Sequence, residues 1–323
     1  MVSFRGKLIN GLAKRGIDVS LDLKDRPYAA VLVVGGTRDL PGLWHAKRRG
    51  VRIVQRLDGM NWIHRKRRTG WRHYARAEYG NIILSVIRSR LADKIVYQSE
   101  FSHQWWERIY GISQRPWHIV YNGVDLQHYS PTGEGKKPDD HIRILLVEGA
   151  ISGGYEWGLE TAIQVAERIN RPDKKRVELM VVGRVAESLQ REWSKKAVIP
   201  INFTGLVPQE KIAELDRSAH VLYAADLNAA CPNSVIEAMA CGLPVVAFDT
   251  GALSELVEES AGSIVPYGGD PWKLDPPDIE KLVEAALIIL KNQAKFSKGA
   301  RDRAEEAFSL EQMVEGYLSA LNL

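Results

Sequence analysis

The stretch Cys231-Pro-Asn-Ser-Val-Ile-Glu-Ala-Met-Ala-Cys-Gly-Leu-Pro-Val-Val246 predicts a short helix that leads directly into a strand. Pro232 favours a helix start, Gly242 favours the end of that helix, and Pro244 cannot continue it. The run Val245–Phe248 is apolar throughout, as expected of a strand buried on both faces of a sheet. A helix joined to such a strand is the repeating unit of α/β folds with parallel sheets.

The same alternation of apolar runs and amphipathic stretches extends along the whole chain. In the first half we expect strands at Val19–Leu23, Ala30–Val34, Val51–Gln55, Lys94–Tyr97 and Ile119–Tyr121. In the second half we expect them at Ile142–Val147, Val177–Val182, Ile201–Phe203, Val221–Tyr223, Val245–Phe248 and Ser263–Val265. The pattern predicts an α/β protein with two doubly wound, Rossmann-like domains. Such sheets bind ligands at the carboxyl ends of their strands, so we expect a site in a cleft that both domains face.

Charge divides the 323 residues into two parts of opposite sign. Residues 1–140 hold 25 Lys and Arg against 13 Asp and Glu, whereas the remaining residues carry a net charge of −8. Between the two parts, Ser130–Asp140 is polar and rich in Pro and Gly, which predicts a linker. We therefore expect a first domain at residues 1–130, a linker at 131–141, a second domain at 142–308 and a final helix at 309–323.

Composition excludes several classes of protein. No run approaches the roughly 20 uninterrupted apolar residues that a membrane-spanning helix needs, and Met1–Lys7 lacks the apolar core of a secretion signal. Cys231 and Cys241 are the only cysteines, too few for a disulfide framework. The eight histidines lack metal-site spacing and there is no Asp-x-Asp pair. We expect a cytoplasmic protein that needs no metal and no cofactor.

Two loops are candidate anion sites. Gly149–Gly154 follows one strand and precedes a helix, so the N–H groups of Gly153 and Gly154 could approach a phosphate. Taken alone, these glycines favour the simpler interpretation of a flexible turn between strand and helix. The helix start at Asn233 and Ser234 offers a second set of N–H groups. One turn further, the carboxylate of Glu237 could accept hydrogen bonds from two ribose hydroxyls. The structural alternative is a capping box made by Ser234 and Glu237.

A basic and aromatic stretch marks the first half of the chain. It begins at Lys47 and ends at Arg76, and its densest part runs from His64 through Trp71 and Arg72. A solvated face explains such a run as well as an anionic partner does. Among anionic partners, a membrane surface or a lipid pyrophosphate is favoured over nucleic acid, because no nucleic-acid-binding motif accompanies the run. The residues that we expect at an anionic membrane surface, at the inner face of the membrane, are Arg65, Lys66, Arg67 and Arg68.

The run Cys231–Val246 resembles the donor-site helix of family-4 (group 1) retaining glycosyltransferases of the GT-B fold. Further segments resemble that family in order and spacing: Ile119–Asp125, Val181–Arg184, Phe203–Pro208 and Phe308–Tyr317. The resemblance implies two facing Rossmann-like domains, with the last helix crossing back to the first domain. It also implies metal-independent transfer of a sugar, with retention, from a nucleotide-sugar to the hydroxyl of a glycan or lipid-linked acceptor in cell-envelope synthesis.

The chain departs from the motifs of that family at three positions. The family carries a Glu, seven residues and a second Glu; the second matches Glu237, but Ala229 stands at the first. An Arg and a Lys that meet the leaving diphosphate correspond here to Ala150 and Trp157. Their loss matters because departure of a nucleoside diphosphate needs charge stabilisation. The first strand and Gly-rich loop of the family also have no counterpart.

The resemblance assigns a role to each candidate residue. Glu237 would hold the ribose, backbone near Val207 the base, and Gly153, Gly154, Asn233 and Ser234 the diphosphate. The remaining candidates are catalytic: Arg184 would replace the missing cations, and Arg56 and Asp58 would face the donor sugar and acceptor from the first domain. Two alternatives remain open. One is a non-catalytic GT-B protein that binds a nucleotide-sugar or supports an active partner, and the other is an adaptor that docks on polyanions or membranes.

Overall fold

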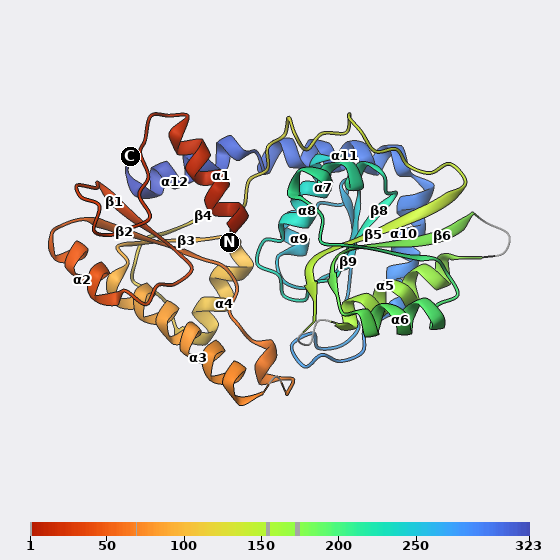
Figure 1. Cartoon of the computed structure of the whole chain (residues 1–323), viewed down its shortest axis with the longest axis horizontal. Coiled ribbons are helices and arrows are strands. Elements are labelled where there is room, and N and C mark those ends of the chain that lie inside the picture. The colour runs from red at the N-terminus through yellow and green to blue at the C-terminus, as the bar shows by residue number, and fades with distance from the viewer. Residues whose placement is uncertain (1, 69, 153–155, 172–174) are drawn as a thin grey trace. The chain divides into compact units, whose positions relative to one another are not determined.

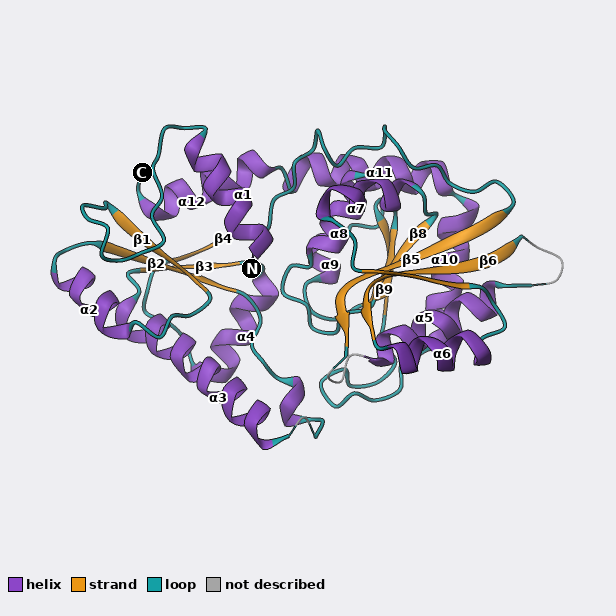
Figure 2. Cartoon of the chain, in the orientation of Figure 1, coloured by secondary structure: helices purple, strands orange, loops and turns teal. Residues whose placement is uncertain are grey.

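The structure, a computed structural model, describes residues 2–68, 70–152, 156–171 and 175–323. Contacts within the chain divide it into two compact units. Unit 1 contains Met1–Gly123 and Phe308–Leu323, and unit 2 contains Val124–Ala307. Each unit has a parallel sheet with helices on both faces (Figures 1 and 2), which confirms the predicted α/β class.

Unit 1 has the strand order β1-β2-β3-β4, with every neighbouring pair parallel. Its strands are β1 (Ala30–Val34), β2 (Arg52–Leu57), β3 (Lys94–Tyr97) and β4 (Trp117–Ile119). Its helices are α1 (Val2–Ala13), α2 (Leu40–Arg48), the 3-10 helix η1 (Ile63–Arg65), α3 (Trp71–Val86), the π-helix η2 (Ile87–Leu91), α4 (Glu100–Tyr110) and α12 (Leu310–Leu321). Alternate residues of the strands face opposite layers: Val54 and Val96 pack against α1 and α12, whereas Val33 and Ile53 pack against α2 and η2.

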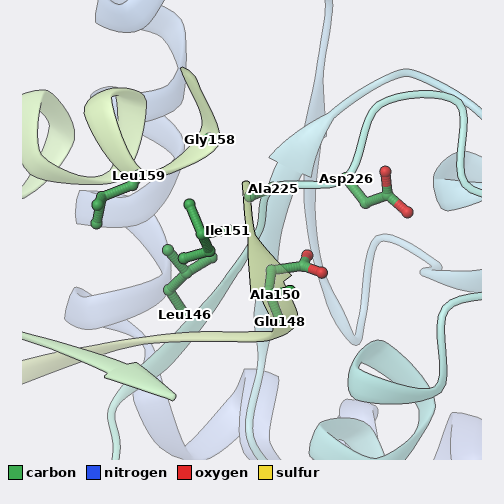
Figure 3. A pocket seen from close by; sticks show the side chains of 8 residues that line it. All are labelled: Leu146, Glu148, Ala150, Ile151, Gly158, Leu159, Ala225 and Asp226. Carbon is green, nitrogen blue, oxygen red and sulfur yellow. The ribbon is translucent and has the colours of Figure 1, made fainter. Parts of the chain in front are cut away.

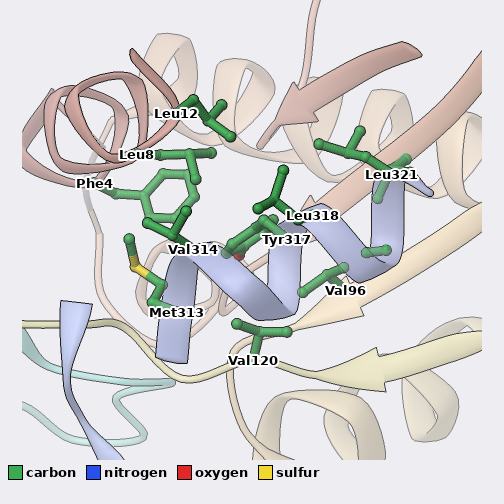
Figure 4. Packing of buried hydrophobic residues seen from close by; sticks show 12 residues of the cluster. Phe4, Leu8, Leu12, Val96, Val120, Met313, Val314, Tyr317, Leu318 and Leu321 are labelled. Carbon is green, nitrogen blue, oxygen red and sulfur yellow. The ribbon is translucent and has the colours of Figure 1, made fainter. Parts of the chain in front are cut away.

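The C-terminal helix α12 completes the core of unit 1. Val314 and Tyr317 are fully buried, and the Tyr317 ring lies 5.1 Å from that of Phe4 in α1 (Figure 4). The two helices approach closely at Gly11, where a Cβ atom would lie 2.4 Å from the Val314 side chain. A glycine at this position therefore permits the contact between the first and last helices of the chain.

The strand expected at Val19–Leu23 does not form. Its alternation of apolar and polar residues fits a strand, but Val19 and Leu21 are 41% and 70% exposed. This segment and β1 together line a cavity of about 890 Å³ on the side of β1 away from β2. A strand needs a hydrogen-bonded neighbour, and no strand within the described ranges pairs with this segment. The prediction was wrong because the alternation of apolar and polar residues shows which side chains could share a face of a strand, but it does not provide a neighbouring strand to pair with.

The boundary between the units lies at Gly123, earlier than the expected position after residue 130. Two arginines of unit 2 bind the backbone of the segment that follows. The Arg217 guanidinium donates to the carbonyls of Ser130 and Glu134 at 3.1 and 2.6 Å, and Arg301 donates to the carbonyl of Tyr129 at 2.8 Å. Residues expected to form a linker are therefore part of unit 2.

Unit 2 has the strand order β10-β9-β8-β5-β6-β7, again parallel throughout. Its strands are β5 (His141–Ile151), β6 (Arg176–Val185), β7 (Ile201–Gly205), β8 (Val221–Ala224), β9 (Val245–Phe248) and β10 (Gly262–Val265). Its helices are α5 (Glu156–Ile169), α6 (Glu187–Lys196), α7 (Gln209–Arg217), α8 (Asn233–Ala240), α9 (Leu253–Leu256), α10 (Ile279–Lys291) and α11 (Gln293–Ala307). After β7 the chain returns to the other side of β5, so the strand order reverses between β5 and β8. Ligands bind at such a reversal, outside the carboxyl ends of the strands.

Candidate functional site

Helix α8 follows a loop that starts at the end of β8, one of the two strands at this reversal. Its N-cap residue is Pro232, which has no side chain able to accept a hydrogen bond. Ser234 lies inside the helix, so the capping box expected from Ser234 and Glu237 does not form. The first N–H groups of a helix have no partner within the helix. The N-cap residue makes no side-chain hydrogen bond to this end of the helix, so the N–H groups at Asn233 and Ser234 are candidate donors to an anion.

Glu237 lies on α8 and is 7% exposed. Its charge, together with burial, raises the pKa values of Tyr129 and Asp216, which places the carboxylate near both side chains. The Tyr129 hydroxyl donates to the carbonyl of Gln209, the first residue of α7, at 3.4 Å. Val207 is half-buried in the loop immediately before α7. Tyr129 thus connects the surroundings of Glu237, the expected ribose ligand, with the loop expected to hold the base.

Arg184 lies near the end of β6, in direct register with Ala150 of β5. Neighbouring strands are about 4.8 Å apart. Both residues are exposed, so the guanidinium is not committed to the core. The register therefore brings a cation next to Ala150, the position at which the resemblance leads us to expect an arginine.

A bulge in β5 sets this register. The pairing between β5 and β6 shifts between Val147 and Ala150. Opposite the bulge, Gly183 has φ +136°, and a Cβ atom there would lie 1.8 Å from the carbonyl oxygen of Glu148. Only glycine fits this position, because any side chain would collide with backbone. Gly183 therefore permits the bulge that aligns Ala150 with Arg184.

Two carboxyl groups that the sequence analysis did not single out line a pocket at the same edge of the sheet. Glu148 follows Val147 in β5, and Asp226 follows β8. The pocket has a volume of about 150 Å³, with Leu146, Ile151 and Leu159 on one side and the two carboxyl groups on the other (Figure 3). Burial raises both pKa values, and the neighbouring Asp226 raises that of Glu148 further. The sequence signal that could have identified these two carboxyl groups is their position directly after apolar strand residues.

In unit 1, Arg56 and Asp58 differ in exposure. Arg56 is 3% exposed, its guanidinium lies 3.8 Å from the centre of the Phe4 ring, and it donates to the Asn122 side chain at 2.9 Å. Asp58 is about a third exposed, with a carboxylate oxygen 4.0 Å from Arg56 Nη1. Arg56 is the second-last residue of β2 and Asp58 directly follows the strand, at the strand end where the site is expected. Of the pair, Asp58 is the residue that a ligand can reach directly.

Two expected phosphate ligands, Gly153 and Gly154, lie outside the described residues. Within the described ranges, no three His, Cys, Asp or Glu side chains are placed to hold a metal ion. In the same part of the chain, no helix has the length and apolar character required to cross a membrane.

Family models match most of the chain. Residues 143–292 match the model described as glycosyl transferases group 1, and residues 23–128 match the model described as glycosyltransferase family 4. The chain belongs to the family-4 (group 1) glycosyltransferases. The two matched ranges lie mostly in different units of the structure, 23–128 in unit 1 and 143–292 in unit 2.

The individual relatives of this chain are distant. An uncharacterized glycosyltransferase of Methanocaldococcus jannaschii is 25% identical over 206 residues, which cover 62% of this chain and 50% of that protein. The D-inositol 3-phosphate glycosyltransferase of Geodermatophilus obscurus is 25% identical over 228 residues, which cover 65% and 48%. The chain thus spans about half the length of these curated relatives.

Solved structures show the same fold. A sucrose-phosphate synthase from Thermosynechococcus elongatus aligns with a TM-score of 0.69 at 19% identity, over 90% of this chain and 72% of that chain. Anabaena HepE, crystallised with UDP-glucose, aligns with a TM-score of 0.65 at 18% identity, over 89% and 78%. These matches identify the architecture as GT-B.

Proposed function

We propose that the protein transfers a sugar, with retention, from a nucleotide-sugar to an acceptor hydroxyl. One observation carries the proposal: the strand register sets Arg184 beside Ala150 at the edge of the sheet where α8 begins. A cation at this place compensates for the arginine and lysine that the family uses. The UDP-glucose complex of HepE supports a nucleotide-sugar donor.

The donor would lie along the carboxyl edge of the unit 2 sheet. N–H groups at Asn233 and Ser234 and the positive end of α8 hold the diphosphate. Glu237 accepts hydrogen bonds from the ribose, and the loop at Val207 contacts the base. As the glycosidic bond breaks, negative charge grows on the leaving diphosphate, and Arg184 stabilises it there.

The acidic pocket suits the sugar rather than the diphosphate. A raised pKa keeps the Glu148 carboxyl protonated near neutral pH, so it can donate a hydrogen bond to a sugar oxygen without repelling the phosphates. The Asp226 carboxyl group can accept a hydrogen bond from a sugar hydroxyl. No metal has a role in this scheme, because the charges are met by side chains and backbone. We further propose a glycan or lipid-linked acceptor of the cell envelope, with Asp58 on the acceptor side and Arg56 holding it in place.

The test is sugar transfer and donor hydrolysis with a panel of nucleotide-sugars. Arg184→Ala should lower kcat by about 10²-fold while changing donor affinity little, because the charge it meets develops in the transition state. Arg191→Ala is the matched control, since Arg191 is an exposed arginine on α6. Equal turnover of Arg184→Ala and wild type would show that Arg184 does not replace the missing cations.

A second candidate function is donor binding without catalysis. Ala229 supplies no carboxylate where the family has its first Glu, and its backbone carbonyl accepts a hydrogen bond from Ala252 N–H at 2.9 Å. If the wild-type protein binds a nucleotide-sugar in calorimetry but neither transfers nor hydrolyses it, its function is donor binding and the proposed sugar transfer is wrong.

A further inference from the structure

Helix α3 has a buried side and an exposed side, and both carry apolar side chains. On its inner face, Ile83 packs in the buried cluster that continues to Ile87 of η2. On its outer face, Trp71, Tyr79 and Ile82 are 76%, 54% and 54% exposed. A surface helix normally turns polar residues toward solvent. The exposed apolar face of α3 therefore requires a partner of its own.

The outer side chains form a continuous stripe. At 3.6 residues per turn, positions 71, 75, 79 and 82 fall within an arc of about 80°. Arg72 and Arg76 lie beside this stripe, and the Arg72 guanidinium is 5.4 Å from the centre of the Trp71 ring. Lys66, Arg67 and Arg68 are exposed in the segment that leads to α3. The apolar stripe is thus bordered by cations.

The sequence around α3 supplies few acidic side chains to offset these cations. Between Asp58 and Asp93 the sequence contains eight Lys and Arg residues and a single acid, Glu78. Glu78 accepts hydrogen bonds from Arg65 at 2.5 and 2.8 Å and contacts His64 Nε2 at 2.7 Å. These partners lower the pKa of Glu78 to about 2, so it stays charged and bound. Arg65, which the sequence analysis expects at the membrane, is therefore bound to Glu78. The cations that border the apolar stripe lie further along the chain, from Lys66 to Arg76.

Charge and residue type together identify the partner. Tryptophan and tyrosine rings collect at the interface between lipid and water, where one end of the ring is apolar and the other is wet. Cations beside such rings meet lipid phosphates. An apolar protein interface would instead exclude charged residues from its centre. The combination on α3 matches an anionic bilayer.

We propose that α3 docks on the surface of an anionic membrane, with Trp71, Tyr79 and Ile82 entering the headgroup region. The cations that bind lipid phosphates are Lys66, Arg67, Arg68, Arg72 and Arg76. The docking uses a face of unit 1 that has no role in the proposed sugar transfer, so either proposal can fail without the other.

Vesicle flotation tests the docking. Wild-type protein should float at low salt with vesicles of phosphatidylcholine plus phosphatidylglycerol, and not with phosphatidylcholine alone. Each nearby Arg contributes roughly fivefold to binding at low ionic strength, so Arg72→Gln/Arg76→Gln should lower the partition coefficient about 25-fold and weaken its salt dependence. Trp71→Ser/Ile82→Ser should also reduce binding but keep the salt dependence.

The matched control is Val198→Ser/Ile288→Ser in unit 2, at apolar residues that are 77% and 54% exposed, and it should float like wild type. Circular dichroism establishes that each variant is folded. The proposal is overturned if wild type ignores the anionic vesicles, or if both α3 variants float as well as the control. A second result also overturns it: wild type does not float and instead sediments as a dimer, and the Trp71→Ser/Ile82→Ser variant sediments as a monomer. The stripe would then join two copies of the chain.

Discussion

At the scale of single residues, the carboxyl group of Glu148 is the most informative. Burial and the neighbouring Asp226 raise its pKa above the ordinary value of 4.5, so the folded protein binds a proton that the unfolded chain releases at a lower pH. Its contribution to stability is therefore complete below pH 4.5 and is lost as pH rises through the folded-state pKa. The same ionisation adds negative charge beside the proposed diphosphate site.

Glu148→Gln should consequently weaken the pH dependence of donor affinity and of the free energy of unfolding. Wild type should lose donor affinity and unfolding free energy toward alkaline pH, whereas the variant, which stays neutral, should lose less of both. Calorimetric donor titrations and urea unfolding at mildly acidic and alkaline pH measure the two effects. Glu156→Gln, at a half-buried acid at the start of α5, serves as the control. Parallel profiles for wild type and Glu148→Gln would remove Glu148 from the site.

At the scale of secondary-structure elements, the bulge in β5 determines which side chains of β5 and β6 are neighbours. The bulge exists because Gly183 leaves room for the Glu148 carbonyl. Without it, the register would slip by a residue and side chains would exchange faces of the sheet. The placement of Arg184 beside Ala150 thus depends on a glycine in the same strand.

Gly183→Ala should destabilise the protein by about 3 kcal/mol, since it combines a disfavoured φ with a backbone collision. Gly149→Ala is the control, because a Cβ atom there meets nothing within 4 Å. The midpoints of urea unfolding measure both. A Gly183→Ala variant as stable as Gly149→Ala would mean that the strand pairing differs from the one described.

At the scale of the whole molecule, the two ends of the chain hold unit 1 together. Tyr317 of α12 is fully buried against α1, so residues from opposite ends of the sequence share one core. Tyr317→Ala should cost about 3–5 kcal/mol. Hydrogen exchange should accelerate in β2, β3 and α1 while the strands of unit 2 keep their protection. Tyr79→Ala, at an exposed tyrosine, is the control, and acceleration in both units alike would contradict the division into units.

The sequence by itself determined the α/β class, nearly every strand and the short helix around Glu237 that leads into β9. These are local properties: apolar runs, helix-start prolines and helix-end glycines act over a few residues. Tertiary structure decided what depends on partners distant in the chain. Val19–Leu23 has the alternation of a strand but finds no neighbour, Ser234 cannot cap a helix that begins before it, and Arg65 is bound by Glu78. Glu148 and Asp226 meet only because β5 and β8 are adjacent, and hydrogen bonding between strands, burial and charge pairing all require that adjacency.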